Sequence, residues 1–141
     1  MAYRNSIYQL KTQWFSALNG VISVPVYKDS VPLNESRNYV LIYSDGSSDA
    51  GVTNTGFFRS VVIVIDIVTK FANISNSKLV NDIATEIDLI VMQSPNSYGI
   101  TLPNFNITQI TVQSENEIND NDGDEKVFRL VKRYEHFVNQ I

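Results

Sequence analysis

The chain has 141 residues, of which 43% are hydrophobic and 18% charged, and its formal net charge at pH 7 is −4. This length and composition predict one globular domain, 1–141, with enough apolar residues to bury a core without a disulfide or structural metal. The chain contains no cysteine, which excludes disulfides, thiolate metal sites and cysteine nucleophiles.

The hydropathy pattern indicates neither a secretory signal nor a membrane span. The first residues contain no unbroken apolar stretch of the kind found in signal peptides. The longest apolar run, Val61 to Ile65, is far too short to cross a bilayer. We therefore expect a soluble intracellular protein that does not enter a membrane.

The negative charge is concentrated in one segment. Residues 114–125, S-E-N-E-I-N-D-N-D-G-D-E, contain six of the 15 acidic residues and no basic one. The remainder of the chain shows no basic stripe of the kind that nucleic-acid binders carry. Four basic residues follow the segment, but strand alternation divides them between two faces, so we expect solvated charges on an edge strand: Lys126, Arg129, Lys132 and Arg133.

The first expected element is a helix over Ile7 to Asn19, with Ser6 as its N-cap and Gly20 as its C-terminal stop. Its apolar residues recur at helical spacing, so one stripe of the helix should pack on the core. Trp14 lies in this stripe, and we interpret it as a core residue rather than part of a cofactor site.

Three strands are expected next. Val21 to Tyr27 is rich in β-forming residues but contains Pro25, which cannot donate to a ladder and therefore indicates an edge or kinked strand. Asn38 to Ser44 reads as a second strand. Phe57 to Phe71 is the strongest strand signal, and its length predicts a central position. The glycine-rich stretch Asp45 to Gly56 is expected to form a long flexible loop.

The second half of the chain predicts one helix and two strands. The helix starts at Asn76 or Ser77, follows the i, i+3, i+4, i+7 template and stops at Ser94-Pro95. Asn106 to Gln113 and Val127 to Val138 alternate as strands, and the acidic segment is expected to be the polar loop between them.

This order of elements, α-β-β-β-α-β-β, indicates an α+β fold. Hairpin-like links join most neighbouring strands, and one crossover contains the long helix. We therefore expect an antiparallel or mixed sheet of about five strands with two helices packed on one face.

Motifs that carry catalysis or metal binding are lacking or incomplete. Asp120, Asp122 and Asp124 have the spacing of an EF-hand, but the glycine comes fourth rather than sixth and Val131 occupies the place of the twelfth-position glutamate. The sequence contains no phosphate-binding glycine motif and no nucleophile elbow. We interpret His136, the single histidine, as structural and expect neither enzymatic activity nor a cofactor.

Asp66 interrupts the apolar strand Phe57 to Phe71. Its alternation partners on the same face include Ser60 and Lys70, which favours a solvent-side or interface position. The alternative is a buried acid with a perturbed pKa.

The two expected long loops are the candidate functional segments, because loops longer than hairpin turns often mediate interactions. The alternative is that both are plain solvated loops. As assembly or interface residues we predict the acidic residues that these segments contain: Asp45, Asp49, Glu115, Glu117, Asp120, Asp122, Asp124 and Glu125.

Most of the chain resembles the tail-terminator and tail-completion proteins of tailed bacteriophages. The resemblance lies in the N-terminal helix closed by Gly20 and in four stretches that follow it. These are V-P-V-Y-K-D-S-V-P (24–32), Y-V-L-I (39–42), V-V-I-V-I-D-I-V-T (61–69) and L-V-N-D-I-A-T-E-I (79–87). The family often has a proline before the tyrosine of Y-V-L-I, whereas this chain has Asn38 there.

The resemblance implies a structural virion protein at the head–tail junction, assembled in the host cytoplasm. Such proteins form rings, with six copies usual for tail terminators, that join the tail tube to neck or connector proteins and leave a lumen through which DNA passes. The acidic segment would then face a basic partner surface or the DNA channel. Two alternatives are a connector or neck adaptor ring of a different tail type, and a small cation-binding module with an acidic loop.

Overall fold

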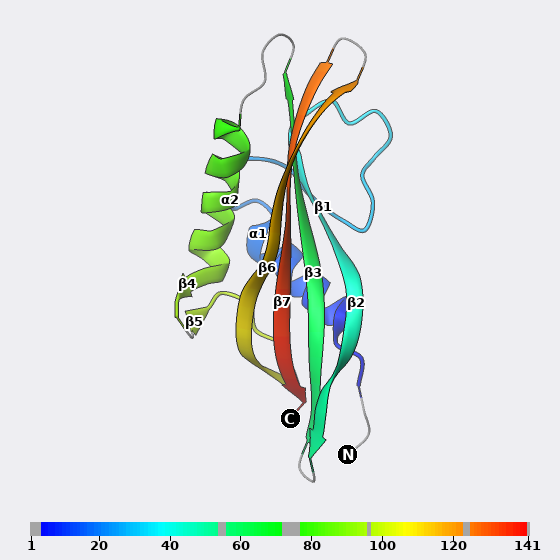
Figure 1. Cartoon of the computed structure of the whole chain (residues 1–141), viewed down its shortest axis with the longest axis vertical. Coiled ribbons are helices and arrows are strands. Elements are labelled where there is room, and N and C mark those ends of the chain that lie inside the picture. The colour runs from blue at the N-terminus through cyan, green and yellow to red at the C-terminus, as the bar shows by residue number, and fades with distance from the viewer. Residues whose placement is uncertain (1–3, 54–55, 72–76, 96, 123–124, 141) are drawn as a thin grey trace.

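The computed structural model describes residues 4–53, 56–71, 77–95, 97–122 and 125–140. Figure 1 shows a slender molecule in which long strands run along the main axis and two helices lie beside them. The elements in chain order are α1 (Ile7–Leu18), β1 (Val26–Lys28), β2 (Tyr39–Thr53), β3 (Gly56–Phe71), α2 (Lys78–Val91), β4 (Met92–Ser94), β5 (Ser97–Tyr98), β6 (Phe105–Asp122) and β7 (Glu125–Gln140).

The main sheet is mixed and has five strands in the order β1-β2-β3-β7-β6. β1 runs parallel to β2, and the other neighbours are antiparallel. The expected fold class and element order are confirmed. β4 and β5, which the sequence analysis did not foresee, form a small separate ribbon after α2.

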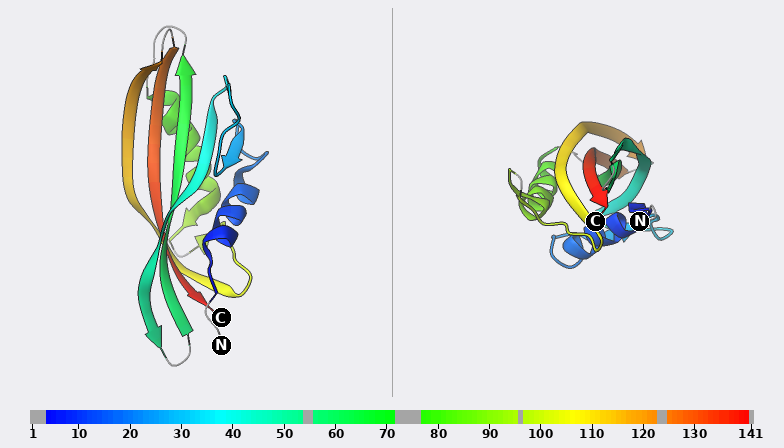
Figure 2. Two further views of the ribbon diagram at one scale, coloured as in Figure 1. Left: turned by 90° about the vertical axis from the view of Figure 1, so that its right-hand side faces the viewer. Right: turned by 90° about the horizontal axis from the view of Figure 1, so that it is seen from below.

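Both helices cover the same face of this sheet, as the views in Figure 2 show from two further directions. Every second residue in the middle of β3 packs with residues of α1 and α2 in a single apolar cluster. These four β3 residues are fully buried: Val61, Ile63, Ile65 and Ile67. Because successive strand residues point to opposite sides, the other set of β3 faces away from the helices. We call that side the helix-free face.

Helix α1 forms as the sequence predicts, with one exception at its start. Leu10, Trp14 and Leu18 are buried along one stripe. Gly20 follows the helix at φ +78°, a backbone conformation that glycine adopts without steric cost. The Ser6 side chain does not cap the helix; instead the Ile7 N–H donates to Asn5 Oδ1 at 2.9 Å.

The two long loops expected from the sequence are wrong, because most of each segment is strand. Asp45 to Thr53 continues β2, and Ser114 to Asp122 continues β6. Each is paired residue by residue with a strongly strand-forming partner, β3 or β7. Weak local strand propensity is overridden where a partner strand satisfies the backbone hydrogen bonds.

Strand β7 is also placed differently from expectation. It lies between β3 and β6 in the interior of the sheet, not at an edge. The edge position indicated by Pro25 is confirmed, since the short β1 that follows it is an edge strand and Val40 N–H donates to the Pro25 carbonyl. Among the described residues, no helix is both long and apolar enough to span a membrane.

A buried polar contact joins α1 to β7. Trp14 Nε1–H donates to His136 Nε2 at 2.9 Å, so Nδ1 carries the ring proton and donates to the Val61 carbonyl at 3.1 Å. The Tyr134 ring packs against Trp14 in a tilted arrangement, with ring centroids 4.9 Å apart. Both ring nitrogens of His136 are therefore engaged, and burial lowers the pKa of His136 from 6.5 to about 4.

This contact predicts acid sensitivity. As pH falls below 6.5, the unfolded chain takes up a proton at His136 before the folded chain does, so stability should fall between pH 6.5 and 4, by roughly 3 kcal/mol from this group alone. Urea unfolding at several pH values will measure the effect. His136→Asn, which does not titrate, should show a shallower pH dependence; an unchanged one would contradict the assignment.

Candidate functional site

The helix-free face has a buried centre even though no helix covers it, and most residues around that centre are partly exposed. Val64, Val68 and Val131 are at most 6% exposed and lie outside the apolar cluster that packs against the helices. Tyr39 and Tyr43 flank them on β2, since Tyr39 pairs with Val68 and Tyr43 with Val64. This face therefore has a small apolar centre of its own.

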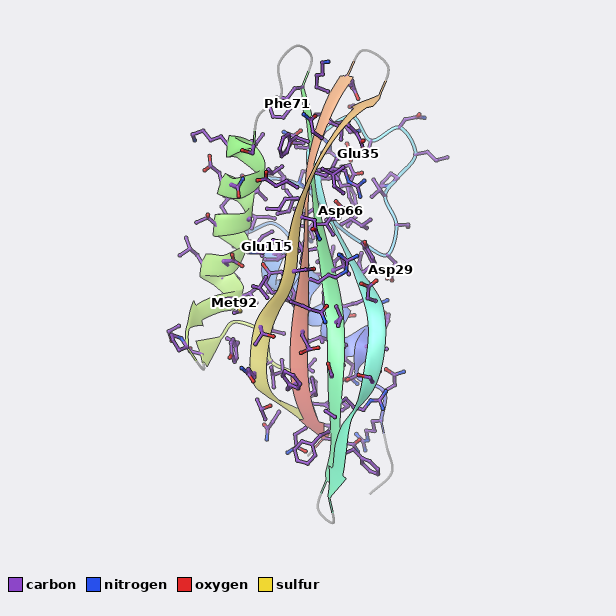
Figure 3. The ribbon with its side chains drawn as sticks, viewed as in Figure 1. Asp29, Glu35, Asp66, Phe71, Met92 and Glu115 are labelled. Atoms are coloured by element: carbon purple, nitrogen blue, oxygen red, sulfur yellow. The ribbon has the colours of Figure 1, made fainter. Side chains whose placement is uncertain are left out.

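A charged pair lies in this centre. Asp66 is 5% exposed, and its two carboxylate oxygens accept from Arg129 Nε at 3.2 Å and Nη2 at 2.5 Å. Figure 3 shows Asp66 near the middle of the sheet's length. The hydrogen bond to Asp66 raises the pKa of Arg129. Asp66 lies on the side that the sequence analysis expected, but it is buried and paired rather than solvated.

A groove of about 560 Å³ lies over this pair. The groove extends across much of the width of the helix-free face, because its lining residues come from β2, β3, β7 and β6. These residues are Tyr39, Leu41, Asp66, Val68, Lys70, Asp120, Val127 and Arg129. Two cations, two carboxylates and a tyrosine give it mixed polarity. Such a surface suits a protein segment better than a phosphate, because Asp66 already engages the guanidinium group of Arg129.

The segment between β1 and β2 is fixed by polar contacts next to the groove. Glu35 accepts hydrogen bonds from Arg37 and from the Tyr27 hydroxyl, and Lys70 Nζ donates to the Glu35 carbonyl. The Arg37 and Tyr27 donors lower the pKa of Glu35 to about 2. The segment between β1 and β2 therefore has defined anchors on β1 and β3.

The predicted acidic residues do not form one site. The register places Asp45 and Asp49 on the half of the sheet that leads to the β2–β3 turn, and Glu115 to Glu125 on the half that leads to the β6–β7 turn. The described ends of these two strand pairs lie at opposite ends of the molecule (Figure 1). The backbones of Asp49 and Asp122 lie in strands, whereas Asp124 lies outside the described residues.

Several of these carboxylates have partners within the chain. Asp45 accepts from Arg133 Nε at 2.7 Å, and this bond raises the pKa of Arg133. Glu117 accepts from Asn81 of α2 at 3.1 Å. Asp120 lines the groove, and Glu125 is exposed at the start of β7. These contacts join β7 to β2 and α2 to β6, and they leave fewer free charges than the sequence indicated.

Glu115 belongs to a cluster that the sequence analysis missed. Lys132 Nζ is 2.7 Å from Asp88 of α2 and 2.9 Å from Glu115, and the Tyr134 hydroxyl donates to Asp88 at 2.6 Å. Lys132 is 3% exposed, so the prediction of a solvated edge charge is wrong. Its position on the core side of β7, in alternation with Tyr134, was the available signal. Burial is the main cause of the raised pKa of Tyr134.

In the parts of the chain that the structure describes, no three histidine or acidic side chains converge in a way that would hold a metal ion. The EF-hand-like residues fall partly outside that range, because only the backbone of Asp122 and nothing of Asp124 is described.

These features define a class: an α+β protein built on an elongated mixed sheet, with helices on one face and a hairpin projecting at each end. Its fold is similar to that of a chain in a solved structure titled as the virion of a native gene transfer agent particle. The alignment covers 93% of this chain and 91% of that one, with a TM-score of 0.51 and 17% sequence identity. No protein-family model and no curated protein matches the sequence.

The buried ion pair gives a stability prediction. Arg129→Met leaves Asp66 buried without its partner and should destabilise the fold by about 3 kcal/mol, at the low end of the range for buried pairs because Arg129 is partly exposed. The double variant Asp66→Val with Arg129→Met should recover most of this loss. Urea denaturation will decide, and a double variant no more stable than the single one would contradict the uncompensated-charge account.

Proposed function

We propose that this protein is a structural component of a virion that assembles as a ring at the head–tail junction, in a tail-terminator or tail-completion role. Six copies are the number we expect in the ring. The ring would stop growth of the tail tube, join it to neck or connector proteins and leave a lumen for DNA. This role requires no catalysis and no cofactor.

The observation that carries the proposal is the fold likeness to a virion chain over nearly the whole length of both chains. The resemblance of the sequence to tail-terminator and tail-completion proteins points independently in the same direction. The elongated shape supports an assembly role, because the two hairpin ends can reach different neighbours while the sheet between them remains fixed (Figure 1).

The charge distribution suggests how such a ring would meet its neighbours. The β6–β7 end carries Asp120 and Glu125, while the cations nearest the middle of the helix-free face, Arg129 and Arg133, are paired internally. A hairpin end with excess negative charge would dock on a basic partner surface, or would discourage DNA from binding where it passes. A connector or neck adaptor ring of another tail type would use the same surfaces with different partners.

Native mass spectrometry of the purified protein, with negative-stain electron microscopy, tests the ring. A closed homo-oligomer, or a concentration-dependent series that ends at one closed size, is the expected result. The measurement should be repeated with calcium. A strict monomer that takes up stoichiometric calcium would overturn the proposal in favour of a cation-binding module.

The acidic hairpin end can be tested by removing its charge. Asp120→Asn, Asp122→Asn, Asp124→Asn and Glu125→Gln together should leave the melting temperature within a few degrees of wild type, since surface changes usually cost little. The fraction of the ring that co-sediments with purified tail tubes should differ from that of the wild type. Asp82→Asn with Glu86→Gln on α2 serves as the control, and unchanged docking of the hairpin variant would contradict an assembly role for this end.

A further inference from the structure

The sheet presents two outer edges that run in opposite directions. Along the order β1-β2-β3-β7-β6, every step from β2 onward is antiparallel, so β2 and β6 point in opposite directions. β1 covers β2 only from Val40 to Ile42. Within the described residues, the rest of β2 and the whole of β6 therefore have a strand partner on one side only.

Each outer edge contains a regular stretch that is bounded by bulges. On β6 the register shifts fall between Ile107 and Gln109 and between Val112 and Ser114. On β2 they fall between Ser44 and Gly46 and between Asp49 and Gly51. We call Gln109–Val112 the β6 edge segment and Gly46–Asp49 the β2 edge segment.

These two segments lie on the same rows of the sheet, where a row is a set of residues paired with one another across neighbouring strands. Ser48 pairs with Ser60, Ser60 with Phe137, and Phe137 with Gln109. Two rows further along, Gly46 is connected in the same way to Thr111. A neighbouring copy related by rotation about an axis roughly parallel to the strands would therefore bring its β2 edge segment beside the β6 edge segment without sliding along the strands.

The charges along β6 favour this half of the edge for pairing. The β6 edge segment has no charged residue and the β2 edge segment has one, Asp49 at its end, whereas Glu115, Glu117 and Asp120 occupy the other half of β6. Charged residues on an edge strand oppose pairing with another chain. The acidic half of β6 lies on the same rows as β1 and the start of β2, where no free β2 edge is available.

We propose that the β6 edge segment of one copy pairs in antiparallel fashion with the β2 edge segment of the next copy, so that the sheets join around the ring. The contact joins two different surfaces, which is the kind of contact that closes a ring when the rotation between copies permits. Backbone hydrogen bonds supply affinity, as in other cases of strand addition to a sheet edge. This inference deepens the proposed ring and rests on it.

Cysteine cross-linking tests the pairing directly, because the wild-type chain contains no cysteine. Ser48 and Gln109 lie in one row on the helix-free face, and directly opposed residues in an antiparallel pair are close enough for a disulfide. Mixing the Ser48→Cys and Gln109→Cys proteins under mild oxidation should give a covalent heterodimer. The double variant should give a ladder that ends at the ring size.

Matched controls separate this geometry from others. Thr85→Cys, at an exposed site on α2, mixed with Gln109→Cys should cross-link at least about tenfold more slowly, because it lacks the high effective concentration of an assembled pair. Gln109→Cys alone should remain monomeric on non-reducing gels. A rapid Gln109→Cys homodimer would overturn the proposal in favour of two-fold β6–β6 pairing.

A charge-swap series provides a second readout. Ser48→Lys with Gln109→Lys should weaken oligomerisation, and Ser48→Asp with Gln109→Lys should restore it, since directly opposed like charges repel and opposite charges attract. If the wild type forms rings but the cysteine variants do not cross-link and the charge swaps have no effect, the edge pairing is overturned and the proposed function still stands. Wild-type monomers at every concentration tested, with no cross-link, would count against both.

Discussion

The antiparallel ladder between β3 and β7 is the constraint on which the rest of the structure depends. It runs from Phe58 paired with Asn139 to Phe71 paired with Lys126, and the other two long strands and both helices attach to it. β2 pairs with β3 on one side and β6 with β7 on the other, while both helices pack on one face of the ladder. Because the register of this pair sets which side chains point to each face, a slip of one residue would turn the core residues outward.

This ladder separates two environments. On the helix-covered face, apolar burial dominates, and His136 and Lys132 enter it with hydrogen-bond or ion-pair partners. On the helix-free face, a smaller apolar centre surrounds the Asp66–Arg129 pair, and a groove remains open above it. The first face stabilises the fold, and the second keeps a groove open over the ion pair. That division fits a protein whose work is to hold neighbours in place.

The sequence predicted the elements with strong periodicity and missed what depends on pairing. Amphipathic spacing sufficed for α1, α2 and the apolar part of β3, and Pro25 correctly indicated an edge. The stretches 45–53 and 114–122 look like loops because glycine, serine, aspartate and asparagine disfavour strands locally; only the partner strand makes them extended. For the same reason the acidic residues appeared as one class of site, although the register divides them between the two ends. The Lys132–Asp88–Glu115 cluster joins β7 to α2 and β6. Alternation along β7 indicates that Lys132 faces the core, but no local pattern indicates which carboxylates it meets there.

The hydrogen bond between Trp14 and His136 also has a consequence for how the chain folds. It joins residues 122 positions apart, whereas the β2–β3 and β6–β7 hairpins connect neighbours in sequence. Local hairpins close quickly, and contacts of high sequence separation form late because their loop-closure entropy is large. During synthesis α1 emerges first, yet its apolar stripe has no complete surface to pack on until β7 has left the ribosome. The N-terminal helix should therefore wait, exposed, for the last strand, and the docking of Trp14 should be among the final events of folding.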